Sequence, residues 1–244
     1  MKILTSIITV IFALSVNTAL AQEKIKVLAF SQVEPGIYHH LSNLDGIALL
    51  EKLGKKRGWD VDVSHDRESF NAQRLSQYDV VAFINSTGNI LNDAQQTAFE
   101  SYIKAGGGYV GTHSAADTEH GWEWYGKMVG GYFKSHPEVN QVAMANLENA
   151  DHPANALIGE TGEILEEWYS YTANVRELPG FTVLMTVDEG TYEGGEMGDD
   201  HPISWAHEYD GGRAFYTGFG HLFQQDHPFL ADMLAGGIEW AAGN

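Results

Sequence analysis

The sequence predicts an α/β protein built on a three-layer, doubly wound and mostly parallel sheet. Short continuous apolar runs, typical of strands buried on both faces, alternate with longer segments whose apolar residues recur at helical spacing. Glycines such as Gly58 and Gly106 stand where the helices are expected to end. The resulting order of strand, helix, strand, strand, helix, strand favours crossover connections and therefore a parallel sheet.

The first half of the chain is expected to hold four strands and two helices. One helix is predicted over residues 45–58, where apolar residues are three or four positions apart, and another over residues 92–105. The expected strands are the apolar or alternating runs at residues 25–30, 59–65, 78–84 and 108–112.

The second half is expected to be richer in strands. No flexible linker separates the halves, so we assign these strands to the same sheet. They cover residues 139–147, 163–171, 181–187, 202–207 and 213–217, and a closing helix covers residues 229–242.

The first 21 residues are typical of a secretory signal peptide. Lys2 is their only charge, an apolar stretch runs over residues 3–16, and Ala19–Ala21 gives an A-x-A cleavage site before Gln22. The stretch is too short for a membrane anchor, and the absence of Cys excludes both a lipid anchor and disulfides. We therefore expect a periplasmic or secreted protein whose residues 22–244 form one domain.

The charge balance narrows the possible partners. The chain has 14 Lys and Arg against 33 Asp and Glu, which repels phosphate backbones and anionic lipids. Nucleic acid and membrane surfaces are therefore not expected as partners, and a small molecule is. The 6 Trp and 11 Tyr suit stacking on sugar rings, although most aromatic residues in any protein pack in its core.

His113 is the first candidate catalytic residue. It ends the apolar run 109–112, which follows the glycine triplet 106–108. A buried strand that ends in a tight turn presents one side chain at the carboxyl edge of a parallel sheet, where open α/β folds place their chemistry. Hydrolases built this way carry Ser or Cys there, so an imidazole argues against a thiolate or a Ser-centred triad at this point. The alternative is a structural histidine that caps the next helix.

A series of ordered motifs spans nearly all of the chain after the signal. They are Tyr78–Val81, Asn92–Gln96, Gly106–Asp117, Trp124–Tyr125, Ser135–Pro137, Glu166–Tyr169, His201–Trp205, His207–Arg213 and Tyr216–His221. These motifs resemble the ThuA-like family, which is named for trehalose utilisation. The resemblance implies a flavodoxin-like fold similar to class I glutamine amidotransferases, with His113 in place of their Cys and His221 near their catalytic His. Amidotransferase activity does not carry over, because the nucleophile is missing.

The chain departs from the family pattern near its start. The family has one histidine shortly after the first strand, whereas this chain has His39 and His40. His39 matches by its distance from Gly36, and His40 matches by its distance to Gly46. Only one is expected to face the site; we assign His39, with His40 as the alternative.

Two kinds of chemistry compete for the candidate catalytic residues His113, Glu167, His221 and Asp117. In the first, His39, His113 and His221 bind a divalent metal such as zinc, with Glu167 or Asp117 as a carboxylate ligand or orienting group. In the second, the same side chains act as general acids and bases. No local spacing such as HExxH decides between them.

The resemblance also implies a substrate class. ThuA-like proteins occur with sugar dehydrogenases that oxidise a glycoside at its 3-hydroxyl. A 3-keto group acidifies the C2 hydrogen, so a base could remove it and expel the group at C1, and His113, Glu167 and His221 fit such an elimination. The alternatives are a sugar-binding protein without turnover and a metal-dependent amide or ester hydrolase. Cleavage of ordinary glycosides would instead require a carboxylate pair, Glu166 or Glu167 with Asp117.

Further residues are expected to bind the substrate, and some have a structural alternative. They are His39, Trp122, Tyr125, His136, His201, His207, Arg213 and Tyr216. Trp122 and Tyr125 could equally pack against the sheet, and Arg213 could neutralise a neighbouring carboxylate. The acidic, glycine-rich segment 188–200 is expected to form a mobile loop over the site.

Overall fold

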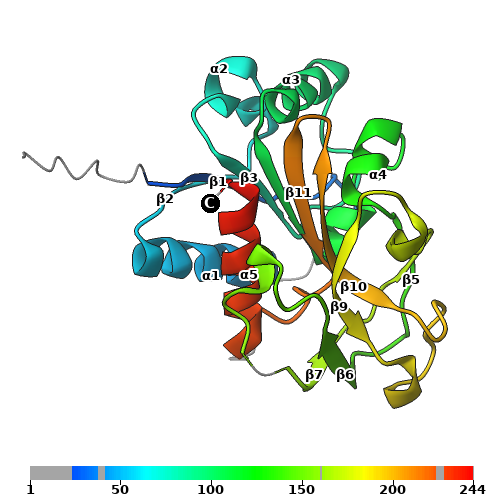
Figure 1. Cartoon of the computed structure of the whole chain (residues 1–244). Coiled ribbons are helices and arrows are strands. Elements are labelled where there is room, and N and C mark those ends of the chain that lie inside the picture. Colours follow the sequence, from blue (N-terminus) through cyan, green and yellow to red (C-terminus); the bar gives the residue numbers. More distant parts are fainter. Residues whose placement is uncertain (1–23, 38–41, 160, 224–227, 244) are drawn as a thin grey trace, which may run out of the picture.

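The computed structural model describes residues 24–37, 42–159, 161–223 and 228–243. Within these ranges the longest sheet has nine strands in the order β2-β1-β3-β4-β11-β10-β9-β6-β7, and helices cover both of its faces (Figure 1). The three-layer α/β class predicted from the sequence is therefore confirmed. No helix in the described ranges is long and apolar enough to cross a membrane. The expected signal peptide, His39 and His40 lie outside the described residues.

One half of the sheet is parallel. Buried apolar runs form it, and every residue of the third and fourth strands is buried, as continuous apolar runs predict. The parallel strands are β2 (Asp60–Ser64), β1 (Lys26–Phe30), β3 (Val80–Ile84), β4 (Gly108–Thr112) and β11 (Gly212–Thr217).

The other half continues the same sheet through antiparallel pairings, as expected for strands without a linker. It consists of β10 (Pro202–Tyr209), β9 (Thr182–Val187), β6 (Gln141–Leu147) and β7 (Glu163–Glu166). The expected strand over residues 163–171 is wrong as a single element. The chain leaves the sheet after Glu166, and β8 (Ser170–Tyr171) pairs with β5 (Phe133–Ser135) in a separate two-stranded sheet.

The α-helices lie on the two faces of the sheet (Figure 1). Helices α1 (Ser42–Arg57) and α5 (Pro228–Ala241) contact each other on one face. The other face carries α2 (Ala72–Leu75), α3 (Asp93–Lys104) and α4 (Glu123–Val129). Helix α3 begins with a capping box in which Asn92 and Gln95 each satisfy the other's backbone N–H groups, which explains its sharp start.

Short 3₁₀ helices join several of these elements. They are η1 (Arg67–Ser69), η2 (His113–Asp117), η3 (Pro153–Asn155), η4 (Val175–Glu177) and η5 (Glu189–Thr191). The turn after β4 therefore feeds η2 rather than an α-helix, and η2 begins at His113 itself.

An aromatic layer fills the space between the sheet and helices α3 and α4. The ring centroids of Phe83 and Phe99 lie 5.6 Å apart. Phe83 also contacts Tyr109 at 5.6 Å, and Phe99 contacts Trp122 at 6.4 Å. Trp122 and Tyr125 belong to this layer, so their expected place in the substrate site is wrong and the packing alternative holds. The Tyr125 hydroxyl donates to the carbonyl of Ala115 at 2.8 Å, which anchors the turn behind His113.

Candidate functional site

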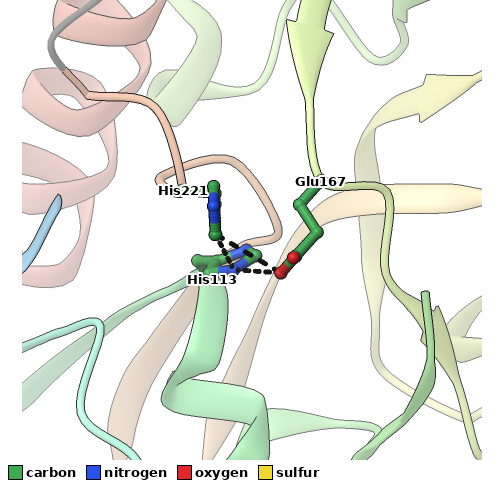
Figure 2. Close-up of side chains that lie close together, drawn as sticks. All are labelled: His113, Glu167 and His221. Atoms are coloured by element: carbon green, nitrogen blue, oxygen red, sulfur yellow. Dashed lines mark hydrogen bonds and ion pairs between the residues drawn. The ribbon is translucent and has the colours of Figure 1, made fainter. Parts of the chain in front are cut away.

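Three side chains from distant parts of the chain meet at the carboxyl edge of the parallel strands (Figure 2). His113 Nε2 lies 3.1 Å from Glu167 Oε2 and 3.3 Å from His221 Nδ1. His221 Nδ1 lies 3.3 Å from the same Glu167 oxygen. The three atoms form a nearly equilateral triangle, and we refer to these residues as the His–Glu–His cluster.

His113 reaches the cluster from the end of β4 through a strained backbone. Its φ is +45°, in the left-handed region that a side chain with a Cβ seldom adopts. The Tyr216 hydroxyl donates to the His113 carbonyl at 2.7 Å, which holds this conformation. A strained residue at the end of a buried strand is the geometry of a nucleophile elbow, here with a buried imidazole.

The next strand fixes the orientation of the His113 ring. His113 Nδ1 lies 3.0 Å from the carbonyl oxygen of Gly218, which follows β11 directly. A carbonyl oxygen only accepts hydrogen bonds, so Nδ1 carries the proton and donates it. Gly218 is required there because a Cβ would lie 2.3 Å from the Tyr171 hydroxyl and 2.5 Å from Ile203.

Glu167 arrives from the opposite end of the sheet. It directly follows β7, the last strand, and the chain then turns back toward the parallel half. The preceding carboxylate, Glu166, is completely buried and accepts the backbone N–H groups of Glu167 at 3.0 Å and Gly220 at 3.1 Å. One buried carboxylate thus ties the segment of Glu167 to the segment of His221.

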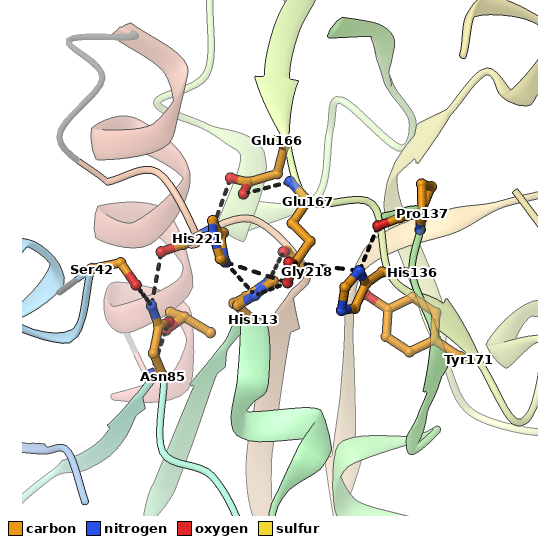
Figure 3. A network of polar contacts seen from close by, with 12 residues as sticks. Ser42, Asn85, His113, His136, Pro137, Glu166, Glu167, Tyr171, Gly218 and His221 are labelled. Carbon is orange, nitrogen blue, oxygen red and sulfur yellow. Dashed lines mark hydrogen bonds and ion pairs between the residues drawn. The ribbon is translucent and has the colours of Figure 1, made fainter. Parts of the chain in front are cut away.

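Asn85 supports the loop that carries His221 from the other side (Figure 3). Its Nδ2 donates to the carbonyl of Gly220 at 2.8 Å and to Ser42 Oγ at 3.0 Å. Its Oδ1 accepts from the Thr112 hydroxyl at 2.7 Å. Asn85 also has a positive φ, +49°, at the end of β3, so strained residues end both neighbouring strands.

Tyr169 and His136 border the cluster on the side of the small sheet. The Tyr169 ring lies 4.0 Å from the His113 ring, centroid to centroid, and His136 stacks on Tyr169 at 5.9 Å. His136 Nδ1 lies 2.6 Å from the Pro137 carbonyl and 3.7 Å from Glu167 Oε1 (Figure 3). Since Nδ1 donates to that carbonyl, the neutral His136 ring has its lone pair on Nε2. His136 is partly exposed, unlike His113.

Glu167 and His221 each favour the charged form of the other. Burial alone would raise the pKa of Glu167, but the hydrogen bonds and charges of His113 and His221 outweigh burial and hold this pKa well below its usual range. Burial alone would lower the pKa of His221, but Glu167, with the charge of Glu166, raises it above its usual value. Burial raises the pKa of Glu166 despite its two N–H donors.

Several residues expected in the site have structural roles instead. His201 is buried between Glu189 and the Tyr169 carbonyl, 2.8 Å and 2.9 Å away. His207 stacks on Phe181 at 3.8 Å. Both histidines are buried beside or on β10, and their positions in the sequence do not reveal this burial.

Arg213, Asp117 and Tyr216 also differ from their expected roles. Arg213 lies at the amino end of β11, opposite the cluster, where it donates to the Trp240 carbonyl at 3.0 Å. Asp117 ion-pairs with His120 at 2.7 Å rather than joining Glu167. Tyr216 is buried and acts on the site only through the His113 carbonyl.

The acidic segment 188–200 is not a free loop. Glu189 accepts the backbone N–H groups of Met197 and Gly198, both at 2.9 Å. Asp200 pairs with Arg176 at 2.8 Å. The Asp188 N–H donates to the Met144 carbonyl at 2.9 Å, so the segment is attached to the body of the protein at both ends, in contrast to the expected mobile loop over the site.

Sequence patterns left two parts of the site unassigned. Asn85 directly follows the buried run of β3, so the same strand-end argument that singled out His113 points to it. Tyr169 lies in the motif Glu166–Tyr169, but its contact with His113 depends on the turn after β7, which no local pattern encodes.

Fold and cluster together define an α/β protein with a histidine–carboxylate site at the carboxyl edge of a parallel sheet, where related architectures carry a nucleophile. The family model for ThuA, described as trehalose utilisation, matches residues 26–241. The chain therefore belongs to the ThuA family, which is linked to carbohydrate metabolism and whose fold resembles that of glutamine amidotransferases.

Solved structures agree with this fold. A putative ThuA-like protein from Bacteroides uniformis superposes with a TM-score of 0.74 at 22% identity, covering 92% of this chain and 94% of that one. A second, from Parabacteroides merdae, gives 0.71 at 18% identity over 91% of each chain. A cytoplasmic protein from Salmonella typhimurium gives 0.61 at 15% identity, over 89% and 99%. No curated protein sequence matches the chain.

Proposed function

We propose that this protein is an enzyme that cleaves 3-keto-glycosides by elimination. The observation that carries the proposal is the largely buried His–Glu–His cluster at the carboxyl edge of the sheet, on a fold of the ThuA family. Elimination needs proton transfer and stabilisation of an oxyanion, and it needs no nucleophile. Two imidazoles and a carboxylate suit this chemistry.

The chemistry follows from the 3-keto group. A base removes the C2 proton, and the electron pair moves onto the C3 oxygen to give an enediolate. The enediolate then forms the C1–C2 double bond while the C1–O bond breaks, and the departing oxygen takes up a proton. The products are an alcohol and an unsaturated keto-sugar, and addition of water to the latter gives the free 3-keto-sugar.

The surroundings of the cluster suggest a division of roles. The imidazoles of the cluster stabilise the charge on the enediolate oxygen, because the cluster is largely buried and is fixed by backbone contacts before any substrate arrives. His136 accepts the C2 proton, because its Nδ1 is held by the Pro137 carbonyl and its Nε2 is the basic nitrogen. Tyr169, which is buried between His136 and His113, holds these two rings in position.

The proposed substrate, a 3-keto-glycoside, must first be made by oxidation of a glycoside. A sugar dehydrogenase that oxidises the 3-hydroxyl of a glycoside must supply it. We also propose that the chain is exported to the periplasm or beyond, as the sequence of its first 21 residues suggests.

The test compares a 3-keto-glucoside with its parent glucoside. We expect release of the aglycone only from the oxidised sugar, and incorporation of deuterium at C2 when the reaction runs in D₂O. His136→Gln should lower kcat by a factor of about 10² to 10⁴, the usual contribution of a general base. His120→Gln, which removes a surface imidazole paired with Asp117, is the matched control and should leave kcat unchanged. Equal cleavage of both sugars would refute the proposal.

A metal-dependent amide or ester hydrolase is the second candidate. The geometry of the cluster favours it, because two histidines and one carboxylate also form the ligand set of hydrolytic zinc sites. Hydrolysis of aryl esters or amides, with no turnover of the 3-keto-glucoside, would select this function over elimination.

A further inference from the structure

We infer that His113 Nε2, Glu167 Oε2 and His221 Nδ1 form a binding site for one divalent transition-metal ion, which keeps at least one coordination position open for a substrate oxygen. The three atoms come from the ends of β4, β7 and β11 and converge on one point (Figure 2). The site stands on this geometry alone. Its use in catalysis rests on the proposed function.

The first argument is the spacing of the three atoms. They lie 3.1, 3.3 and 3.3 Å apart. Ligands that bind a zinc ion tetrahedrally at about 2.0–2.1 Å lie roughly 3.3–3.4 Å from one another. The triangle therefore has the size of one face of a metal coordination shell, with no rearrangement of the side chains required.

The second argument is the tautomer of His113. Its Nδ1 donates to the Gly218 carbonyl, so the neutral ring has a lone pair on Nε2. That lone pair faces a carboxylate oxygen, which also only accepts. Two such atoms 3.1 Å apart are held together only by a cation between them, either a proton on His113 Nε2 or a metal ion. A metal ion satisfies both acceptors and His221 Nδ1 at once.

The third argument is the charge environment of Glu167. Among the ion pairs of the described residues, this carboxylate pairs with His113, His136 and His221 and with neither Lys nor Arg. Its side chain is only 15% exposed. A largely buried carboxylate whose partners are all imidazoles lacks a permanent counter-charge, because an imidazole is charged only when it is protonated, and a divalent ion supplies that charge.

The groups behind the three ligands have the arrangement expected around a metal. A histidine ligand generally donates its second ring N–H to a carbonyl or carboxylate, as His113 does to Gly218. Glu166 holds the backbone of Glu167 and that of Gly220, next to His221, so two ligands are fixed by one buried group. The site is therefore organised before an ion binds.

The donor set indicates the class of ion. Imidazole nitrogen suits zinc, copper, iron and nickel, whereas calcium, magnesium and manganese prefer oxygen ligands. An ion with an open position would draw electron density from the C3 oxygen of a keto-sugar, which is the charge stabilisation that the proposed elimination needs. Zinc is the simplest probe because it has no redox chemistry.

The test measures binding without any sugar. The chain, produced without a polyhistidine tag, is stripped with a chelator and titrated with Zn²⁺ by calorimetry, and with Co²⁺ by visible absorption. We expect one ion per chain and a d–d spectrum of a four- or five-coordinate site. Glu167→Gln and His221→Gln should each weaken Zn²⁺ binding by at least tenfold, while His120→Gln should bind like the unmodified chain.

Circular dichroism and thermal unfolding of each variant separate lost ligands from lost folding. If a variant does not fold, stabilisation of the unmodified chain by Zn²⁺, measured as a rise in Tm that saturates at one equivalent, still decides the question. Absence of binding to the folded chain, or equal binding by Glu167→Gln, overturns the inference. Binding of one ion without turnover of a 3-keto-glucoside refutes the proposed function and leaves the metal site standing. Turnover of the 3-keto-glucoside by a chain that binds no Zn²⁺ refutes the metal site and leaves the proposed function standing.

Discussion

Protonation of His207 should make the fold sensitive to mild acid. Its Nε2 donates to the Met128 carbonyl at 2.7 Å, its ring stacks on Phe181, and burial lowers its pKa to about 4. In the unfolded chain a histidine has a pKa of about 6.5. As the pH falls, the unfolded chain therefore takes up this proton first, and the folded state loses stability.

The size of the effect follows from the two pKa values. Each pKa unit corresponds to about 1.4 kcal/mol, so the full loss between pH 6.5 and pH 4 is about 3 kcal/mol, of which about 2 kcal/mol falls between pH 7 and pH 5. His207→Gln keeps an N–H donor for the Met128 carbonyl but does not titrate. Its free energy of unfolding should therefore fall by about 2 kcal/mol less over the same interval.

Urea unfolding followed by tryptophan fluorescence at pH 7 and pH 5 measures this difference. Other titrating groups, including His201, whose pKa is also lowered by burial, are present in both proteins and cancel in the comparison. His207→Gln should keep full activity if the side chain is structural, and this separates the observed packing from the expected substrate contact. Equal losses of stability in the two proteins between pH 7 and pH 5 would refute the reasoning.

Three further predictions concern the support of the site, the core and the first residues. Asn85→Ala removes the contacts that hold the Gly220 carbonyl, so kcat should fall by about tenfold to a hundredfold with a folded protein by circular dichroism; unchanged kcat would contradict this role. Tyr125→Phe should cost about 1–2 kcal/mol in urea unfolding because the buried Ala115 carbonyl loses its donor, whereas a loss of substrate affinity instead would return Tyr125 to the site. Mass spectrometry of protein from the periplasm should give a chain that begins at Gln22, and an intact Met1 would disprove export through this signal.

The sequence by itself determined the fold class, most strand positions and the place of His113. Strands buried on both faces, such as β3 and β4, read as continuous apolar runs because both of their faces need apolar side chains. His113 follows such a run directly, and in a parallel sheet this places it at the edge where strands deliver polar groups. Those inferences needed only local patterns and general topology.

The sequence analysis named Glu167, His221 and Asp117 as candidates beside His113, and the tertiary structure decided that Glu167 and His221 join it whereas Asp117 pairs with His120. Glu167 directly follows β7, the last strand of the sheet in space, and it reaches the site only because the chain turns back between β7 and β8. His207 and His221 look alike in sequence, each in a motif rich in glycine and aromatics, yet one is packed on Phe181 and the other lies beside His113. The direction and surroundings of a side chain depend on which strands become neighbours, and that is settled by long-range pairing rather than by the residues next to it in the chain.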